Sequence, residues 1–166
     1  MDLLLIIDMQ EGFRCKDTLK ILPNIMRLKD SFKEMIVYTK YVNHNSSLFV
    51  SQLGWTQFVN EQDQMILNEL RTPNNTEIVH DTYTVLNDEL KMFIKNNSIT
   101  RVYIAGIYTN VSIIKTAMDL FDNSIEAFII VDACNSLHGQ INHNAAIDSL
   151  RHILGKKNIV ITQELL

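Results

Sequence analysis

Short runs of apolar residues recur along this chain of 166 residues. The first run, residues 3–7, is uninterrupted and is followed by Asp8. A continuous apolar run of this length is typical of a parallel strand that is buried on both faces of a sheet. We predict five strands from such runs, at residues 3–7, 35–38, 102–105, 128–131 and 159–161, and a shorter sixth strand at residues 77–79.

The stretches between these strands carry apolar residues at helical spacing, as Leu22 and Ile25 illustrate. One stretch ends just before Gly155, which two lysines follow, and a glycine stop with nearby cations is typical of a helix C-terminus. We predict helices at residues 19–32, 88–95, 110–121 and 144–154, and a further helix around residues 63–70.

Strands that alternate with helices need crossover connections, and these produce a parallel sheet with helices on both faces. We therefore predict an α/β fold of three layers, α/β/α, with a doubly wound, mostly parallel, Rossmann-like sheet in the strand order 3-2-1-4-5-6. The composition, 46% hydrophobic and 20% charged, is sufficient for one core, so we expect a single domain over residues 1–166.

Charge and cysteine content exclude several classes of partner. The net charge is −4 and no run of Lys or Arg stands out, so we expect no nucleic-acid partner. The apolar runs are far shorter than the roughly 20 residues of a membrane-spanning helix, so we expect no membrane span. Two distant cysteines, Cys15 and Cys134, suit free thiols in a reducing compartment, and we predict a cytoplasmic protein.

Three polar residues follow strands at the edge where open parallel sheets bind ligands. Asp8 follows the first strand, His80 follows the strand at residues 77–79, and the loop 106–109 leads to a helix that carries Ser112. A carboxylate, an imidazole and a hydroxyl at one edge can supply a base, an orienting group and a nucleophile.

Three segments give this pattern a family resemblance. Residues 6–13 resemble the opening Asp-x-Gln-x-x-Phe motif of the isochorismatase-like hydrolases, a group that includes cysteine hydrolases and nicotinamidases. Residues 106–117 are similar to the family segment Gly-x-x-Thr-x-x-Cys-Val-x-x-Thr-Ala, with Ser112 at the cysteine. Residues 131–136, with His143 downstream, resemble the late Asp-Ala-x-x-Ser segment. Together these segments extend over most of the chain in the family's order.

The resemblance implies a triad of Asp, Lys and Cys in which the thiolate attacks an amide or imide carbon. Asp8 is kept, His80 stands at the lysine, and Ser112 stands at the cysteine. Branches of the family that lack the cysteine instead hydrate a vinyl ether, with the Asp as the acid. A further alternative is a Ser-His-Asp arrangement, in which His80 is the base for Ser112 and Asp8 fixes its tautomer.

The resemblance also implies an oxyanion hole made by the backbone N–H groups of Tyr108 and Ser112, next to a cis peptide bond between Ile107 and Tyr108. Backbone donors persist when a side chain is replaced, so such a site still binds a carbonyl or carboxylate. We expect Phe13, Trp55 and Tyr108, with Ser112, to line the pocket for a small planar substrate.

Each candidate also has a structural alternative. Asp8 can be a loop acid, Ser112 a small packing residue, and His80 an ordinary histidine. His138 and His143 are interpreted as structural, with His143 holding the loop after Cys134. Cys134 itself is expected to be a buried small apolar group rather than the missing nucleophile.

We predict no metal and no nucleotide cofactor. Zinc-binding relatives use an Asp-x-His and a second His, whereas the corresponding region here offers only His44, flanked by asparagines. No Gly-x-Gly-x-x-Gly follows the first strand. A receiver-like signalling domain would need an acidic pair near that strand, and none is present around Asp2 or Asp8.

Two functions therefore stay open. The first is hydrolysis of a small amide, imide or enol ether by an altered site of Asp8, His80 and Ser112. The second is a family member without activity that serves as a ligand-binding or assembly module. In both cases we expect a homo-oligomer, because symmetric pairing is common among small folds and among the relatives.

Overall fold

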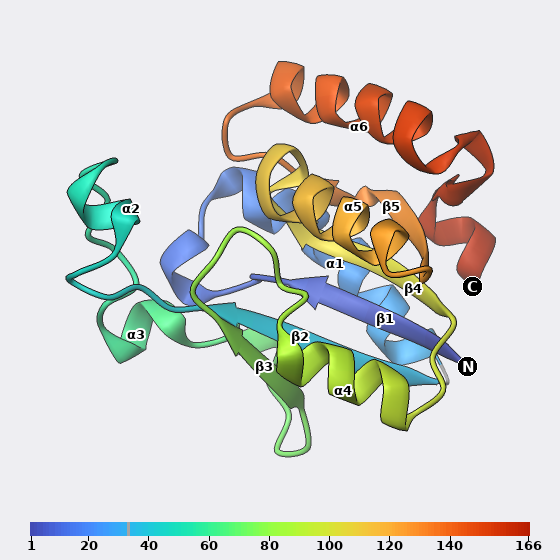
Figure 1. Cartoon of the computed structure of the whole chain (residues 1–166), viewed down its shortest axis with the longest axis horizontal. Coiled ribbons are helices and arrows are strands. Elements are labelled where there is room, and N and C mark those ends of the chain that lie inside the picture. The colour runs from blue at the N-terminus through green and yellow to red at the C-terminus, as the bar shows by residue number, and fades with distance from the viewer. Residues whose placement is uncertain (33) are drawn as a thin grey trace.

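Six strands form one parallel sheet in the order β3-β2-β1-β4-β5-β6 (Figure 1). The computed structural model describes residues 1–32 and 34–166. This arrangement confirms the predicted α/β class and strand order. The strands are β1 (Asp2–Ile7), β2 (Met35–Tyr41), β3 (Thr76–His80), β4 (Arg101–Ile107), β5 (Glu126–Asn135) and β6 (Ile159–Val160).

The central strand β1 explains why its sequence is uniformly apolar. Alternate side chains of a strand point to opposite faces of the sheet. Leu3, Leu5 and Ile7 join the core on one face, and Leu4 and Ile6 join the core on the other. All five side chains are fully buried. The strand thus links two hydrophobic cores and places Asp8 directly beyond both.

Helices cover both faces of the sheet. The helices are α1 (Lys16–Ser31), α2 (Leu48–Ser51), α3 (Glu61–Gln64), α4 (Asp88–Asn96), α5 (Ile114–Asp122) and α6 (Gln140–Leu154). Helix α1 packs on one face, while α4, α5 and α6 contribute to the core on the other face (Figure 1). Helix α6 ends at Gly155, whose φ of 90° fits the predicted glycine stop.

The predicted helix around residues 63–70 is wrong. Helix α3 ends at Gln64, and a separate 3-10 turn follows at Asn68–Leu70. Between them, Ile66 forms an antiparallel bridge with Gln10. The backbone N–H of Glu11 donates to the carbonyl of Met65 at 2.7 Å. These contacts with the segment after β1 hold residues 65 and 66 in an extended conformation. A helix prediction from local periodicity does not take such contacts with distant residues into account.

The helix predicted from residue 110 begins in a different form. Residues Thr109–Ile113 form a π-helix, and the regular helix α5 starts at Ile114. Short π-helical segments are rare and frequently occur at functional sites. Among the residues that the structure describes, no helix has the length and apolar character needed to cross a membrane.

Candidate active site

Asp8 occupies the end of β1 in an unusual backbone conformation. Its φ is 53°, in the left-handed region that few residues other than glycine adopt. The residue is only 3% exposed. Strained backbone positions of this kind cluster at active sites and are kept by the surrounding structure. The geometry therefore agrees with a functional carboxylate more than with an ordinary loop acid.

Gly106 brings the end of β4 against the end of β1. It is paired in register with Ile7, and its φ is 118°. A Cβ atom at this position would lie 2.1 Å from the carbonyl oxygen of Ile7, so only glycine permits the approach. The chain then passes through a cis peptide bond between Ile107 and Tyr108, which confirms the expectation from the resemblance. Ser112 follows on the π-helix.

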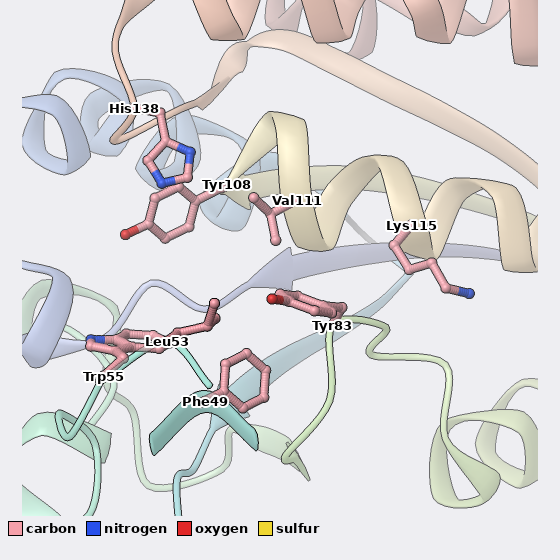
Figure 2. A pocket seen from close by; sticks show the side chains of 8 residues that line it. All are labelled: Phe49, Leu53, Trp55, Tyr83, Tyr108, Val111, Lys115 and His138. Carbon is pink, nitrogen blue, oxygen red and sulfur yellow. The ribbon is translucent and has the colours of Figure 1, made fainter. Parts of the chain in front are cut away.

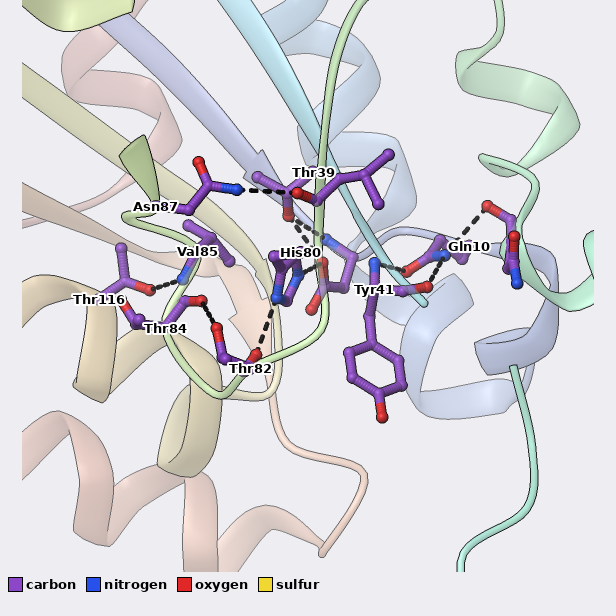
Figure 3. Close-up of polar contacts among 12 residues, drawn as sticks. Gln10, Thr39, Tyr41, His80, Thr82, Thr84, Val85, Asn87 and Thr116 are labelled. Atoms are coloured by element: carbon purple, nitrogen blue, oxygen red, sulfur yellow. Dashed lines mark hydrogen bonds and ion pairs between the residues drawn. The ribbon is translucent and has the colours of Figure 1, made fainter. Parts of the chain in front are cut away.

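Two donors, Thr39 and His80, hold one oxygen of the Asp8 carboxylate. Figure 3 shows these two residues side by side. Thr39 Oγ1 accepts the backbone N–H of Asp8 at 3.2 Å and donates its own proton to Asp8 Oδ1 at 2.6 Å. His80 Nε2 lies 2.8 Å from the same Oδ1. Within the described residues, Oδ2 takes part in no hydrogen bond. One carboxylate oxygen is thus anchored and the other is available to a ligand.

The contacts of His80 define its protonation. Its Nδ1 lies 2.8 Å from the carbonyl oxygen of Thr82, which only accepts, so Nδ1 carries a proton. Burial lowers the pKa of His80, but the charge and hydrogen bond of Asp8, together with the Thr82 carbonyl, raise it above its ordinary value overall. The side chains of His80 and Asp8 are 1% and 5% exposed. They form a buried ion pair, as the lysine of the resemblance would with Asp8.

This arrangement does not favour the Ser-His-Asp alternative. Both ring nitrogens of His80 face an acceptor, so the imidazolium has no lone pair for Ser112. Ser112 is 8% exposed, and its hydroxyl forms no hydrogen bond within the described chain. A serine hydroxyl is a weak nucleophile without a base.

An inner pocket of about 40 Å³ lies beside Asp8. Asp8 and Ser112 line it together, and so do the predicted apolar walls Phe13, Trp55 and Tyr108. His80 does not line it, because this side chain is placed behind Asp8 by their hydrogen bond. The lining residues that sequence reasoning missed are Tyr41, Phe49, Thr82, Tyr83 and Val111.

An adjacent outer pocket of about 620 Å³ shares several of these walls (Figure 2). Trp55 and Tyr108 line both pockets. The remaining lining residues are Phe49, Leu53, Tyr83, Val111, Lys115 and His138. Phe49 lies on the short helix α2, and Leu53 and Trp55 lie in the loop that follows it, in a stretch whose sequence has no periodicity. The only feature of this stretch that points to a pocket wall is its concentration of large apolar side chains.

A polar network supports the π-helix. His143 Nδ1 lies 2.8 Å from Thr109 Oγ1, so His143 holds the helix start rather than the loop after Cys134. Burial, with a smaller effect of Lys20, lowers the pKa of His143. Asn110 Nδ2 donates to His138 Nδ1 at 3.0 Å. His138 is therefore a wall of the outer pocket as well as a structural residue.

The remaining candidates do not add a nucleophile or a metal site. Cys134 is buried in β5, and burial raises the pKa of its thiol, as expected of a small core residue. His44 is not alone, because its Nε2 lies 3.5 Å from Asp81 Oδ2. That pair is exposed, and no group of three or more potential metal ligands occurs among the described residues.

A family model described as the Isochorismatase domain matches residues 2–164. The chain belongs to the isochorismatase family. Enterobactin synthase component B from Escherichia coli K12 is 24% identical over 190 residues, which cover 98% of this chain and 61% of that protein. Isochorismatase family protein 2B from Dictyostelium discoideum is 28% identical over 149 residues, which cover 84% of this chain and 58% of that protein. The chain thus spans about three fifths of the length of these curated relatives.

Solved structures share the fold of this isochorismatase-family chain. An isochorismatase-like hydrolase from Alkaliphilus metalliredigens has a TM-score of 0.88 at 16% identity, with 98% of this chain and 96% of that chain covered. N-carbamoylsarcosine amidase from Thermoplasma acidophilum has a TM-score of 0.86 at 15% identity, with 97% and 96% covered. At such identities the likeness establishes the fold, and the chemistry must be argued from the site.

Proposed function

We propose that this isochorismatase-family chain hydrolyses a small planar molecule that lies in the outer pocket and extends its reacting group into the inner pocket, with the Asp8 carboxylate as the group that transfers the proton. The observation that carries this proposal is the asymmetry of that carboxylate. Oδ1 accepts hydrogen bonds from Thr39 and His80, while Oδ2 has no partner in the described chain. A proton donor or acceptor works best when it is fixed in place and one atom faces the substrate.

An enol ether is the substrate class that this site favours. In such a reaction Asp8 first takes up a proton from solvent at Oδ2, the oxygen that His80 does not hold, and passes it to the vinyl carbon. The resulting oxocarbenium ion takes up water. The hemiketal then breaks to a ketone and an alcohol, and the proton released by water returns through the carboxylate to solvent, which restores the ion pair with His80. This route needs no nucleophilic side chain, so it tolerates a serine at position 112. The His80 cation stabilises the carboxylate that forms when the proton leaves.

Amide or imide hydrolysis is the second candidate, because Ser112 lines the same pocket as Asp8. In that reaction Asp8 Oδ2 would accept the proton of Ser112 or of water, and the backbone N–H groups of Tyr108 and Ser112 would stabilise the oxyanion. A carboxylate is a weak base for a hydroxyl, so we expect this activity to be slow.

We expect the active protein to be a homo-oligomer without a metal or nucleotide. Helix α5 exposes the large apolar side chains of Met118 and Phe121, which are 44% and 58% exposed, and symmetric pairing would cover such a surface. Light scattering at high protein concentration tests this point, and a monomer would contradict it. Two free cysteines suit the cytoplasm.

The decisive experiment is a substrate panel of enol ethers, amides and imides, assayed with the wild type and with Ser112→Ala. We expect turnover of an enol ether by both proteins. Loss of that turnover in Ser112→Ala would instead assign the serine a nucleophilic role. If neither protein, nor Ser112→Cys, turns over any member of the panel, the chain is a ligand-binding module that has lost its activity.

A further inference from the structure

Tyr41 ends β2 and is paired in register with His80 on β3. The residue is only 4% exposed, yet its hydroxyl has no hydrogen-bond partner within the described chain. Buried hydroxyl groups are nearly always paired, and each exception calls for an explanation such as a missing ligand. An unpaired hydroxyl at the edge of the sheet therefore points to a group that is supplied from outside the chain.

Surrounding rings fix the position of this hydroxyl. Trp55 stacks on Tyr41 with ring centroids 5.3 Å apart and an interplanar angle of 5°. The rings of Phe49, Phe58 and His80 contact the Tyr41 ring edge to face, with centroid distances of 5.3, 5.6 and 5.7 Å, respectively. Because four rings enclose it, Tyr41 cannot turn to reach another partner in the protein. The rings hold the hydroxyl in place, although it forms no hydrogen bond with any group of the described chain.

The location of Tyr41 separates it from Asn158 Oδ1, the other unpaired buried side-chain atom among the described residues. The amide of Asn158 still donates to the Ala127 carbonyl at 2.9 Å, so that side chain has a structural bond. Tyr41 instead lines the inner pocket together with Asp8 and Ser112. The side chain that carries the unpaired hydroxyl thus forms part of the pocket in which the proposed reaction takes place.

The hydroxyl is a donor. Burial raises the pKa of Tyr41 well above its ordinary value, and the negative charges of Asp81 and Asp8 raise it further. The group therefore keeps its proton under ordinary conditions. A donor beside a carboxylate-lined pocket complements an oxygen acceptor on a ligand.

We propose that the Tyr41 hydroxyl donates a hydrogen bond to an oxygen of the ligand in the inner pocket. Tyr41 is thereby a substrate-binding residue, and the substrate is a planar molecule with a carbonyl or carboxylate oxygen in addition to the group that reacts at Asp8. The inference rests on the proposed function only in that it uses the same pocket.

Binding measurements with Tyr41→Phe test the inference without requiring turnover. Tyr38→Phe is the matched control, because Tyr38 is a buried tyrosine on the same strand that does not line the inner pocket. Ligand-observed NMR titrations would use nicotinamide and benzoate as planar probes with a carbonyl or carboxylate oxygen. Toluene would serve as a planar probe with neither a hydrogen-bond donor nor an acceptor.

We expect Tyr41→Phe to weaken nicotinamide or benzoate binding by about three- to tenfold, as the loss of one hydrogen bond predicts. Toluene binding should not change, and Tyr38→Phe should bind all probes like the wild type. The unfolding midpoint of Tyr41→Phe should be equal to or above that of the wild type, because the substitution removes an unpaired polar group.

Equal binding of the oxygen-bearing probes by Tyr41→Phe and the wild type would overturn the inference, and so would the absence of any probe binding to the wild type. The inference and the proposed function can fail separately. Probe binding that depends on Tyr41 without any turnover would reject the hydrolase alone. Turnover with a KM unaffected by Tyr41→Phe would reject the role of Tyr41 alone.

Discussion

The two sides of the Asp8 carboxylate differ in how their polar groups are satisfied. On the scaffold side, Thr39 and His80 both donate hydrogen bonds to Asp8 Oδ1. The carbonyl oxygen of Thr82 accepts a hydrogen bond from the other ring nitrogen of His80. The cleft side includes Asp8 Oδ2 and the hydroxyls of Ser112 and Tyr41, and none of these three atoms takes part in a hydrogen bond within the described chain. The scaffold side fixes the geometry, and the cleft side is left open to a ligand.

The largest effect is expected from His80→Leu, which leaves the buried Asp8 carboxylate without its cation. Breaking one partner of a buried pair costs about 3–5 kcal/mol of unfolding free energy. Urea unfolding would measure it, with His44→Leu as the control, because the His44–Asp81 pair is exposed. That control should lose no more than about 0.5 kcal/mol. Equal losses in the two variants would contradict the distinction between the buried and exposed pairs.

Thr39→Val keeps the shape of the side chain but removes the second donor to Asp8 Oδ1 and the acceptor of the Asp8 backbone N–H. A hydrogen bond to a charged group contributes about 1.5–3 kcal/mol, so we expect the unfolding free energy to fall by at least about 1.5 kcal/mol. Thr18→Val is the matched control, because buried Thr18 donates to a neutral carbonyl, that of Phe13. The unfolding free energy of this control should fall by about 0.5–1.5 kcal/mol. A smaller loss for Thr39→Val than for Thr18→Val would show that Thr39 does not support the carboxylate.

Ser112→Cys sharpens the description of the cleft side. A thiol ionises far more readily than a hydroxyl, and the backbone donors do not have to move. We expect amide hydrolysis to rise by roughly tenfold or more, measured as kcat/KM. Ser112→Ala provides the comparison and should show no gain. His80→Lys in addition to Ser112→Cys should not lower this rate, since a lysine keeps the cation beside Asp8. An unchanged rate in Ser112→Cys would mean that the pocket does not position an amide for attack.

The smallest expected effect is the pH dependence of stability from His80. Its folded-state pKa is raised above the ordinary value of 6.5, so its stabilising charge is fully present below that value. As pH rises through the raised pKa, this part of the unfolding free energy is lost. Urea titrations between pH 6 and pH 9 should show the decline in the wild type and a flatter profile in His80→Lys. Identical profiles would argue against an ion pair.

The fold could be predicted because its signals are local. The apolar run of β1 is continuous because both faces of that strand are covered. Helix α6 ends at Gly155 because the backbone of this glycine adopts a positive φ. The failed helix around residues 63–70 shows the limit. Its interruption depends on the bridge between Gln10 and Ile66, which are far apart in the sequence.

The site could be predicted only where a motif or a strand end marks it. Asp8 follows β1 and His80 is the last residue of β3. His80 Nε2 lies 2.8 Å from Asp8 Oδ1. Thr39 and Tyr41 also lie near the end of a strand, but nothing in their sequence shows that one supports Asp8 and the other lacks a partner. The position of Phe49 on the short helix α2 depends on its packing against Tyr41 and Trp55.

The most direct test of Asp8 as the proton-transfer group is the kcat/KM of Asp8→Asn on the best enol ether of the substrate panel. An asparagine keeps an acceptor for Thr39 but cannot transfer a proton. General acid–base catalysis contributes about 10²–10⁴-fold, so we predict a loss of at least about 100-fold with the fold retained by circular dichroism. Turnover by Asp8→Asn within a few-fold of the wild type would contradict the account.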